Sequence, residues 1–180
     1  MLAVHVSPDP PADPFERLFL AEYPRVTAVA RRVLGDAHLA EDVAQDVFAT
    51  FHRLQRADAP YAAAWLHAAA AHTALNVLRT NRRRSEREER EAHVNTAHGA
   101  AGEIRHDPQA QLEVSQERER VRDVLRRMPV KKAGILVLRY GGLSYAEVAA
   151  AMGVGINQVG TLLARAEAAF KKEIERVAPR

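Results

Sequence analysis

Residues 143–170 read LSYAEVAAAMGVGINQVGTLLARAEAAF, and this stretch decides the fold of the C-terminal part of the chain. The pattern predicts a short amphipathic helix, a turn that contains glycine, and a longer second helix. Ser144, followed three residues later by Glu147, is a capping box that starts the first helix. Two helices joined in this way form a helix-turn-helix, whose second helix normally enters the major groove of DNA.

The two helices of this motif have a buried side, and the second helix also has a side that would contact DNA, its reading side. Gly153 and Gly155 allow the chain to reverse sharply, and Asn157 is positioned to cap the second helix. Apolar residues at helical spacing predict the buried side of the two helices: Val148, Ala149, Met152, Val159, Leu162, Leu163 and Ala166. Three residues on the reading side carry no positive charge: Gln158, Gly160 and Thr161.

The composition is that of an ordinary globular protein whose C-terminal part is basic. Of the 180 residues, 47% are hydrophobic and 27% are charged, and the formal net charge is +3. Residues 1–81 hold seven Lys and Arg against nine Asp and Glu, whereas residues 121–180 hold eleven against five. The helix-turn-helix therefore lies in the part of the chain that attracts a polyanion.

Three features that the sequence lacks narrow the expected cellular location of the protein. No apolar run approaches the roughly 18 residues that cross a bilayer, so we expect no membrane insertion. The N-terminus lacks the basic and apolar regions of a secretory signal. The chain has no cysteine, which excludes disulfides and thiolate metal sites and favours a reducing, cytoplasmic location.

Outside the motif, the apolar spacing predicts five further helices and no strand. They span about 15–34, 39–54, 61–79, 112–128 and 131–140, with Pro24 as a local disturbance of the first.

The predicted fold is all-α, with two small helical domains joined by a flexible linker. Residues 1–14, which are rich in proline, form a disordered tail. The first domain spans 15–84, and a highly charged linker without sustained apolar periodicity spans 85–117. The second domain spans 118–180 and contains the helix-turn-helix.

Two sets of motifs carry a resemblance to a known family. In the first domain they are Phe15-x-x-Leu18-Phe19 with Tyr23, the segment LAEDVAQDVF at 39–48, Trp65-Leu66, and Leu78-Arg79 with Arg82 to Arg84. In the second they are Leu125 to Pro129, Leu136-x-Leu138-Arg139-Tyr140, the segment GLSYAEVA at 142–149, Met152-Gly153-Val154 and Arg165-Ala166. Over residues 15–84 and 118–172 the chain resembles the extracytoplasmic-function (ECF) sigma factors of bacterial RNA polymerase, a group within the sigma-70 family.

The resemblance implies that the second predicted helix docks on the clamp helices of the largest subunit of core RNA polymerase. The residues assigned to this surface are Glu41, Asp42, Gln45, Asp46 and Phe48. On a helix the first four cluster at i, i+3 and i+4 spacing opposite Val43 and Val47. The alternative is that these side chains form a helix face that contacts only solvent. The resemblance favours the interface with polymerase.

The resemblance also implies that the third helix and the loop before it capture unstacked bases of the −10 promoter element and aid melting. The assigned residues are Tyr61, Trp65, His67, His72, Asn76, Arg79, Arg82, Arg83 and Arg84. For Trp65, packing in the core is an equally good interpretation. His72 stands where the family often has asparagine, and alanines 68–71 replace bulkier or basic residues, which leaves the captured base open.

The second domain would read the −35 element and bind the flap of the second-largest polymerase subunit. The residues assigned to −35 DNA are Arg139, Asn157, Gln158, Gly160, Thr161, Arg165 and Lys171. Gly160 and Leu162 stand where the family commonly has a lysine and an arginine. We therefore expect a weak or shape-dependent −35 interaction.

No catalytic site, cofactor or metal site is expected. The eight histidines form no H-E-x-x-H motif, and His67 and His72 are five apart, a poor fit to one helix face. The sequence therefore predicts a sigma factor, not an enzyme, that directs promoter-specific initiation and has an anti-sigma factor as a further partner. Two alternatives stay open: a sigma mimic that sequesters an anti-sigma factor, and a helix-turn-helix regulator that acts without polymerase.

Overall fold

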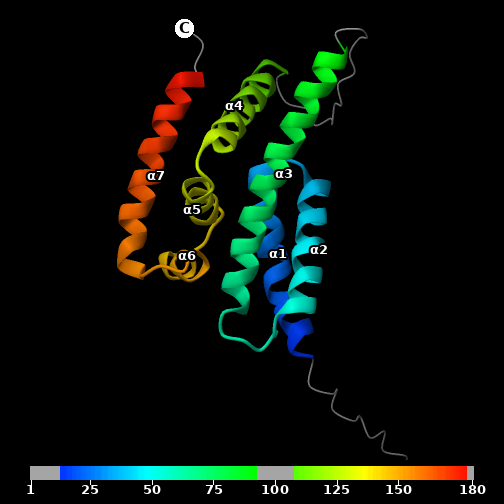
Figure 1. Cartoon of the computed structure of the whole chain (residues 1–180), viewed down its shortest axis with the longest axis vertical. Helices are drawn as coiled ribbons and strands as arrows, with labels where there is room; N and C mark the ends of the chain where they lie inside the picture. Colours follow the sequence, from blue (N-terminus) through cyan, green and yellow to red (C-terminus); the bar gives the residue numbers. More distant parts are fainter. Residues whose placement is uncertain (1–12, 93–107, 178–180) are drawn as a thin grey trace, which may run out of the picture.

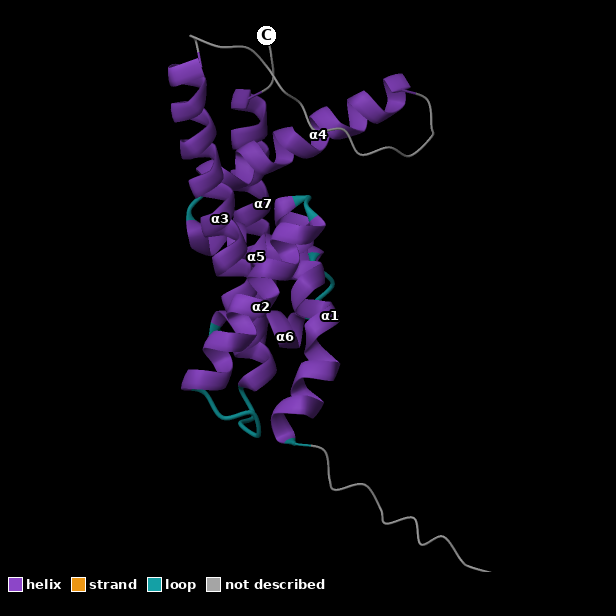
Figure 2. Cartoon of the chain, turned by 90° about the vertical axis from the view of Figure 1, so that its right-hand side faces the viewer, coloured by secondary structure: helices purple, strands orange, loops and turns teal. Residues whose placement is uncertain are grey.

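The computed structural model describes residues 13–92 and 108–177, and the side chains of 13–81 and 114–176. All the described elements are helices, joined by short loops (Figures 1 and 2). They are α1 (Pro14–Leu34), α2 (Ala37–Leu54), α3 (Ala62–Ala92), α4 (Pro108–Arg127), α5 (Val130–Tyr140), α6 (Tyr145–Met152) and α7 (Ile156–Val177). The prediction of an all-α fold is confirmed. None of the helices in this part of the chain is both long and apolar enough to cross a membrane.

The junction between α1 and α2 shows why the chain turns where the sequence indicated. Gly35 ends α1 with φ of +71°, a conformation that glycine adopts without steric cost, and its N–H bonds to the carbonyl oxygen of Arg31. Asp36 then caps α2, because its side chain accepts a hydrogen bond from the N–H of Leu39 at 3.0 Å. Pro24 lies inside α1, which continues past it.

The first three helices pack around an apolar core on one side of the molecule (Figure 1). Fully buried side chains from each helix meet there, among them Val26, Phe51 and Leu66. The alanines of α3, including Ala70 and Ala74 with no exposed surface, let neighbouring helices approach closely. The alanine-rich sequence of α3 is thus a packing feature.

The expected linker at 85–117 stays a prediction, although helices extend into it. α3 continues to Ala92 and α4 begins at Pro108, so helices enter the predicted linker of 85–117 from both sides. The reason is that Arg and Glu favour helix and attract each other at i, i+3 and i+4 spacing even where no apolar face is needed. Residues 93–107 and the expected tail, apart from 13 and 14, lie outside the described residues.

The helix-turn-helix has the expected layout with one correction. Ser144 and Glu147 form the capping box of α6, and Gly153 ends α6 with φ of +65°. Asn157 does not cap α7, which already begins at Ile156. Instead the side chain of Gln158 accepts a hydrogen bond from the N–H of Gly155 at 3.1 Å. On the expected buried side, Val159, Leu163 and Ala166 are buried, while Leu162 and Met152 are half-buried.

The two helical groups pack against each other, which the sequence did not predict. α3 contacts α4, α5 and α6, and α1 contacts α5. The buried apolar residues of both groups form one continuous core. At the seam the approach is close: a Cβ built on Gly141, the residue after α5, would lie 3.2 Å from Cγ2 of Val29 in α1. We call this boundary, between α1 with α3 and α4 to α6, the seam.

Candidate nucleic-acid interface

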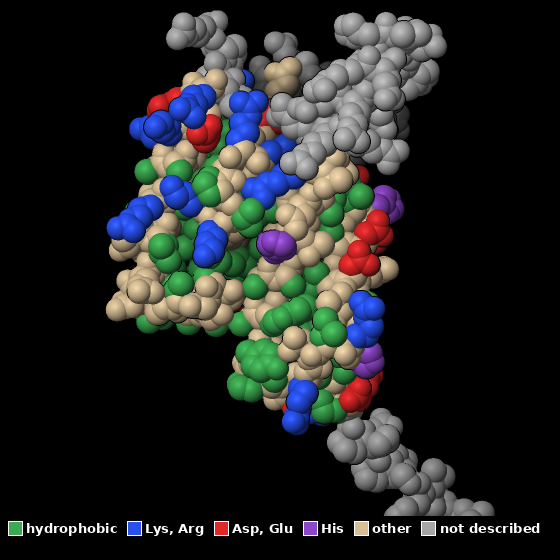
Figure 3. Space-filling view, viewed as in Figure 1, with side chains coloured by type: hydrophobic (Ala, Val, Ile, Leu, Met, Phe, Trp, Pro, Cys, Tyr) green, Lys and Arg blue, Asp and Glu red, His purple; other side chains and the backbone are tan. Residues whose placement is uncertain are grey.

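An acidic strip runs along the outer face of α2. Glu41, Asp42, Gln45 and Asp46 are all exposed, while Val43 and Val47 between them are buried. No ion pair or hydrogen bond joins these four side chains to the side chains described in the structure. Acidic side chains gather along the edge formed by α2 in Figure 3, whereas Lys and Arg are spread over the C-terminal helices. The strip is therefore an uncompensated negative surface.

Phe48, which we assigned to the same surface, is a core residue instead. Its side chain is 3% exposed and its ring centroid lies 5.0 Å from that of Phe19 in an edge-to-face arrangement. Phe15 and Tyr23 complete the cluster at 6.3 and 5.8 Å. Because α2 buries every third or fourth residue, Phe48 falls on the inner face with Val47. It can stiffen α2, but its side chain is not accessible to a partner.

Four of the residues assigned to −10 DNA lie along one side of α3 and the loop before it. Tyr61, Trp65, His72 and Asn76 follow at spacings of four, seven and four, which places them within one stripe. Tyr61 is 49% exposed and donates to Gln55, and Asn76 lies 3.2 Å from Nδ1 of His72. Trp65 is half-buried against Phe51, with ring centroids 5.5 Å apart. Both interpretations of Trp65 thus have a structural basis.

His67 faces the opposite way and is not an accessible DNA contact. It is 1% exposed, and its Nε2 lies 2.8 Å from Oε2 of Glu22 in α1. Burial lowers the pKa of His67, Glu22 opposes that effect, and Arg25 adds to it. A neutral His67 that donates to the Glu22 carboxylate satisfies both buried groups. The spacing of six residues from Tyr61 could have excluded it from the stripe.

Arg79 is held at the seam. Its guanidinium donates to the backbone oxygens of Met128, at 2.7 Å, and Arg126, at 3.2 Å. Both acceptors belong to the end of α4 and the turn after it, a helix end that leaves carbonyl groups unpaired. The side chains of Arg82, Arg83 and Arg84 lie outside the described side chains.

α7 lies on the side of the molecule away from α1 and α2 (Figure 1). Asn157, Gln158, Thr161 and Arg165 are exposed along it, and Lys171 is exposed further on. These five side chains could reach a duplex. Asn and Gln pair with adenine edges, and Arg and Lys bind phosphates.

Tyr145 is a residue of this face that sequence reasoning missed. A Cβ built on Gly160 would lie 4.0 Å from Cε2 of Tyr145, so the tyrosine ring flanks the space that a side chain at 160 would use. The guanidinium of Arg139 lies over the same ring at 5.4 Å and also donates to the carbonyl oxygen of Leu143. The sequence signal was Gly160, because a glycine in the recognition helix leaves room for a neighbouring side chain to lie beside it.

Arg25, which the sequence analysis did not single out, joins the helix-turn-helix to α1. Arg25 of α1 forms an ion pair with Glu147 of α6, and its other guanidinium nitrogen lies 3.5 Å from Glu22. Glu147 therefore serves both the capping box and the seam. The hydrogen bond from Arg25 and that from the Ser144 backbone lower the pKa of Glu147 to about 2.

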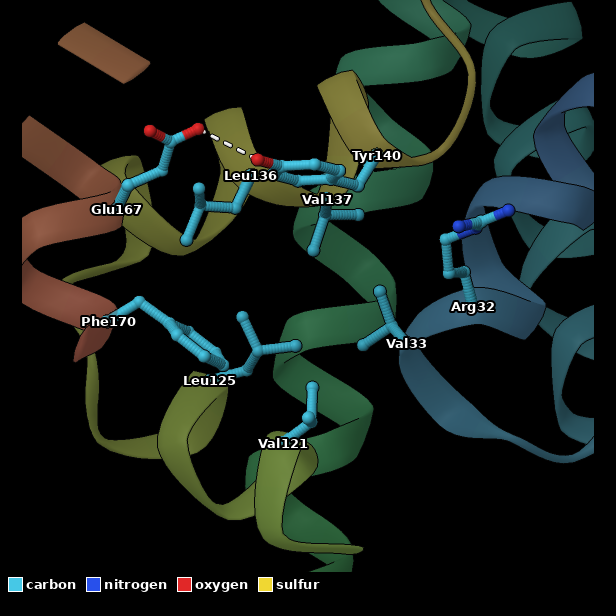
Figure 4. A pocket seen from close by; sticks show the side chains of 9 residues that line it. All are labelled: Arg32, Val33, Val121, Leu125, Leu136, Val137, Tyr140, Glu167 and Phe170. Atoms are coloured by element: carbon cyan, nitrogen blue, oxygen red, sulfur yellow. Dashed lines mark hydrogen bonds between the residues drawn. The ribbon is translucent and has the colours of Figure 1, made fainter. Parts of the chain in front are cut away.

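A cavity of about 360 Å³ opens beside the seam between α1, α4, α5 and α7. Its lining is mainly apolar, with Val33, Leu125 and Phe170 among the side chains that surround it (Figure 4). At one rim Tyr140 donates to Glu167 at 2.8 Å. The described residues contain no group of three or more His, Asp or Glu side chains able to hold a metal ion.

These surfaces define a class of protein: a helical DNA-binding protein whose helix-turn-helix is accompanied by a separate acidic strip and an aromatic stripe. Comparisons with known proteins identify the family. Sigma-70 region 2 matches residues 18–84, and sigma-70 region 4 matches residues 118–170. Together the two matches cover two thirds of the chain, in the family's order.

The chain belongs to the sigma-70 family, in its ECF group. It is a promoter-recognising sigma factor, and the mimic alternative is not favoured. Among solved structures it is similar to the sigma factor RpoE from Bartonella quintana in complex with the anti-sigma factor NepR, at 18% identity and a TM-score of 0.45. That match covers 89% of this chain and 96% of the other. No curated protein matches the chain.

Proposed function

We propose that this sigma factor docks on core RNA polymerase through the acidic strip of α2. The observation that carries the proposal is that Glu41, Asp42, Gln45 and Asp46 are exposed on a rigid helix and have no partner among the described side chains. Unpaired carboxylates fixed on a packed helix attract a basic surface at little cost in conformational entropy. The partner surface would be the clamp helices of the largest subunit.

The stripe of α3 would hold the −10 element once the strands separate. Tyr61 and Trp65 offer aromatic faces on which unstacked bases can stack, and His72 and Asn76 offer donors and acceptors to a base edge. Arg82, Arg83 and Arg84 would bind phosphates. His67 and Phe48 act indirectly, since each supports the core beneath one of these surfaces.

The face of α7 would read the −35 element with few charges. Gln158, Thr161 and Arg165 face outward, and Arg139 with Tyr145 extends the face beside Gly160. Arg139 at one end of this surface and Lys171 at the other would bind DNA phosphates. We expect modest −35 affinity that relies on the shape of the DNA as much as on base contacts.

The remaining partners follow from this assignment. The second domain would also bind the flap of the second-largest polymerase subunit, and an anti-sigma factor would control the free chain. We also propose that the protein is cytoplasmic, because polymerase meets chromosomal promoters there.

Charge reversal tests the docking assignment. We expect Asp42→Lys with Asp46→Lys to weaken binding to core polymerase on the order of tenfold, about 1.4 kcal/mol, because both carboxylates would face a basic surface. Affinity is measured by titration of core polymerase with labelled chain, and circular dichroism checks the fold. Glu16→Lys, an exposed carboxylate on α1, is the control and should bind like the wild type. Unchanged affinity of the double variant removes this surface from the interface.

In vitro transcription tests the function as a whole. Purified chain and core polymerase, given a library of genomic promoters, should produce transcripts whose start sites share upstream −10 and −35 sequences. No transcript from any promoter, together with a tight anti-sigma complex, would favour the mimic.

A further inference from the structure

We infer that the helix-turn-helix reads thymine methyl groups of the −35 element through an apolar patch, which consists of Ile156 and Tyr145 around Gly160. This inference rests on the proposed function and deepens it, because it names the kind of base pair that the recognition helix selects. The patch lies where the recognition helix lacks positive charge, at Gly160 and Leu162.

Ile156 is an exposed apolar residue at the place where a recognition helix meets base edges. It is the first residue of α7, and its side chain is 58% exposed. The start of α7 lies beside α6 at one corner of the molecule, away from α1 and α2 (Figure 1). In a helix-turn-helix the N-terminal residues of the second helix contact the bases. An isoleucine there has no hydrogen-bonding group, so it can offer a base only an apolar contact.

The two amide side chains that follow Ile156 turn their oxygens toward the preceding turn. A Cβ built on Gly155 would lie 2.8 Å from Oδ1 of Asn157 and 3.8 Å from Oε1 of Gln158. The same Oε1 accepts a hydrogen bond from the N–H of Gly155 at 3.1 Å. An amide pairs with adenine through its donor and its acceptor together. Because both oxygens face the turn, Ile156 supplies the outward contact of this first helical turn.

Tyr145 supplies the second half of the patch. Gly160 lies four residues after Ile156, hence on the same side of α7, and has no side chain to cover its neighbour. The ring of Tyr145 is 42% exposed, and its Cε2 would lie 4.0 Å from a Cβ built on Gly160. The guanidinium of Arg139, 5.4 Å from the ring centroid, holds the ring in place. Apolar groups from α6 and α7 thus border the same glycine.

The chemistry of this patch favours thymine over the other bases. In the major groove thymine alone carries a methyl group, whereas guanine presents two acceptors that are read best by Arg or Lys. The patch has an apolar surface and no such donor. The exposed cations Arg165 and Lys171 lie further along α7, where they can bind phosphates. We therefore expect thymines within the −35 element at the positions that face Ile156 and Tyr145.

DNA is also the occupant that the surroundings of the patch favour. An exposed apolar patch by itself can equally bind a protein. Here the patch continues into the side of α7 that carries Thr161 and Arg165, both exposed. It also lies in the basic part of the chain, since residues 121–180 hold eleven Lys and Arg against five Asp and Glu. A polyanion is therefore attracted to this side, and the duplex brings the methyl groups to the patch.

The test removes single methyl groups from the DNA. A promoter that the holoenzyme transcribes is randomised over its −35 region, and the duplexes that the holoenzyme retains define the element. Each thymine of the element is then replaced by deoxyuridine, which pairs as thymine does but lacks the methyl group. We expect the replacement to weaken holoenzyme binding about two- to fivefold at one or two positions. The salt dependence of binding should stay the same, because no phosphate contact is lost.

Variants of the patch assign the methyl contact to its residues. Ile156→Ala should bind the thymine and deoxyuridine duplexes equally at one of these positions, because the methyl group has lost its partner there. Tyr145→Phe keeps the ring and should discriminate like the wild type. Val130→Ala, which shortens an exposed apolar side chain on α5, is the matched control and should also discriminate. Circular dichroism and thermal unfolding check the fold of each variant.

The outcomes separate this inference from the proposed function. If deoxyuridine weakens binding at no position, or weakens it as much for Ile156→Ala as for the wild type, the methyl contact is refuted while promoter reading stands. A selected element without thymine overturns the inference in the same way. A holoenzyme that produces no transcript from any promoter refutes the proposed function, and the inference is refuted with it.

Discussion

At the scale of single residues, the buried pair of Glu22 and His67 is the most unusual feature of the chain. Two ionisable side chains rarely lie in a core unless they satisfy each other. Here Nε2 of His67 lies 2.8 Å from Glu22, and Arg25 and Glu147 are the further charged groups that act on the histidine. The pair joins α1 to α3 beside the ion pair of Arg25 with Glu147.

The lowered pKa of His67 makes stability depend on pH. Its folded pKa lies below the ordinary 6.5 because burial disfavours the charged ring, so the unfolded chain binds more protons below that pH. The stabilisation is therefore complete above pH 6.5 and is lost as the pH falls through the folded pKa. We expect the free energy of unfolding, measured by urea titration from pH 8 to pH 5, to decline faster for the wild type than for His67→Gln.

The comparison needs a second histidine at an exposed position. His38→Gln, at an exposed position of α2, should keep the wild-type pH profile. If His67→Gln declines as steeply as the wild type and His38→Gln, the buried histidine is not the source of the pH dependence.

At the scale of elements, the recognition helix α7 contains a glycine at position 160, which carries no charge and has a low helix propensity. A Cβ there meets Tyr145 at an ordinary contact distance of 4.0 Å, so larger residues fit. We expect Gly160→Ala to raise the free energy of unfolding by about 0.5–1 kcal/mol. Gly160→Lys should also strengthen holoenzyme binding to −35 DNA and steepen its salt dependence by about one ion, since it adds one phosphate contact.

Thermal unfolding and promoter binding at several salt concentrations separate the two effects. Gly160→Ala is the control for the helix, because it changes propensity without charge. Equal salt slopes for Gly160→Lys and Gly160→Ala would show that this position does not face the DNA backbone.

The elements also show what the sequence could and could not predict. Ser144 with Glu147 is a local signal that predicted the capping box of α6, and the structure has it. Asp36 caps α2, which the sequence analysis did not predict. The strip on α2 follows from helical spacing alone. Phe48 and His67 were misplaced because membership of a family motif was allowed to outweigh the helical face on which each residue lies.

Other features depend on contacts between distant parts of the chain. Arg79 and Arg25 meet acceptors 47 to 122 residues away, and no periodicity records such a pairing. The ends of α3 and α4 were missed for a different reason, since a charged helix end without an apolar face resembles a linker. The sequence therefore yields elements and local caps, while the seam requires tertiary structure.

At the scale of the whole molecule, the seam joins the helices of the two matched sigma-70 regions. Its fit is good but incomplete, because the cavity of about 360 Å³ remains beside it. Val33 of α1 lines this cavity together with residues of α4, α5 and α7 (Figure 4). An unfilled space between the domains weakens the packing of one domain on the other, while the core of each domain stays filled.

Filling that space should stabilise the packing at the seam. Val121 of α4 is half-buried and lines the cavity, so Val121→Leu adds one methylene group where room exists. We expect the free energy of unfolding, measured by urea titration, to rise by about 0.5–1 kcal/mol. Val114→Leu makes the same change at an exposed position of the same helix and should leave the free energy of unfolding unchanged. If the two variants unfold with the same free energy, the cavity offers no room for a larger side chain at position 121, and the packing at the seam is already complete there.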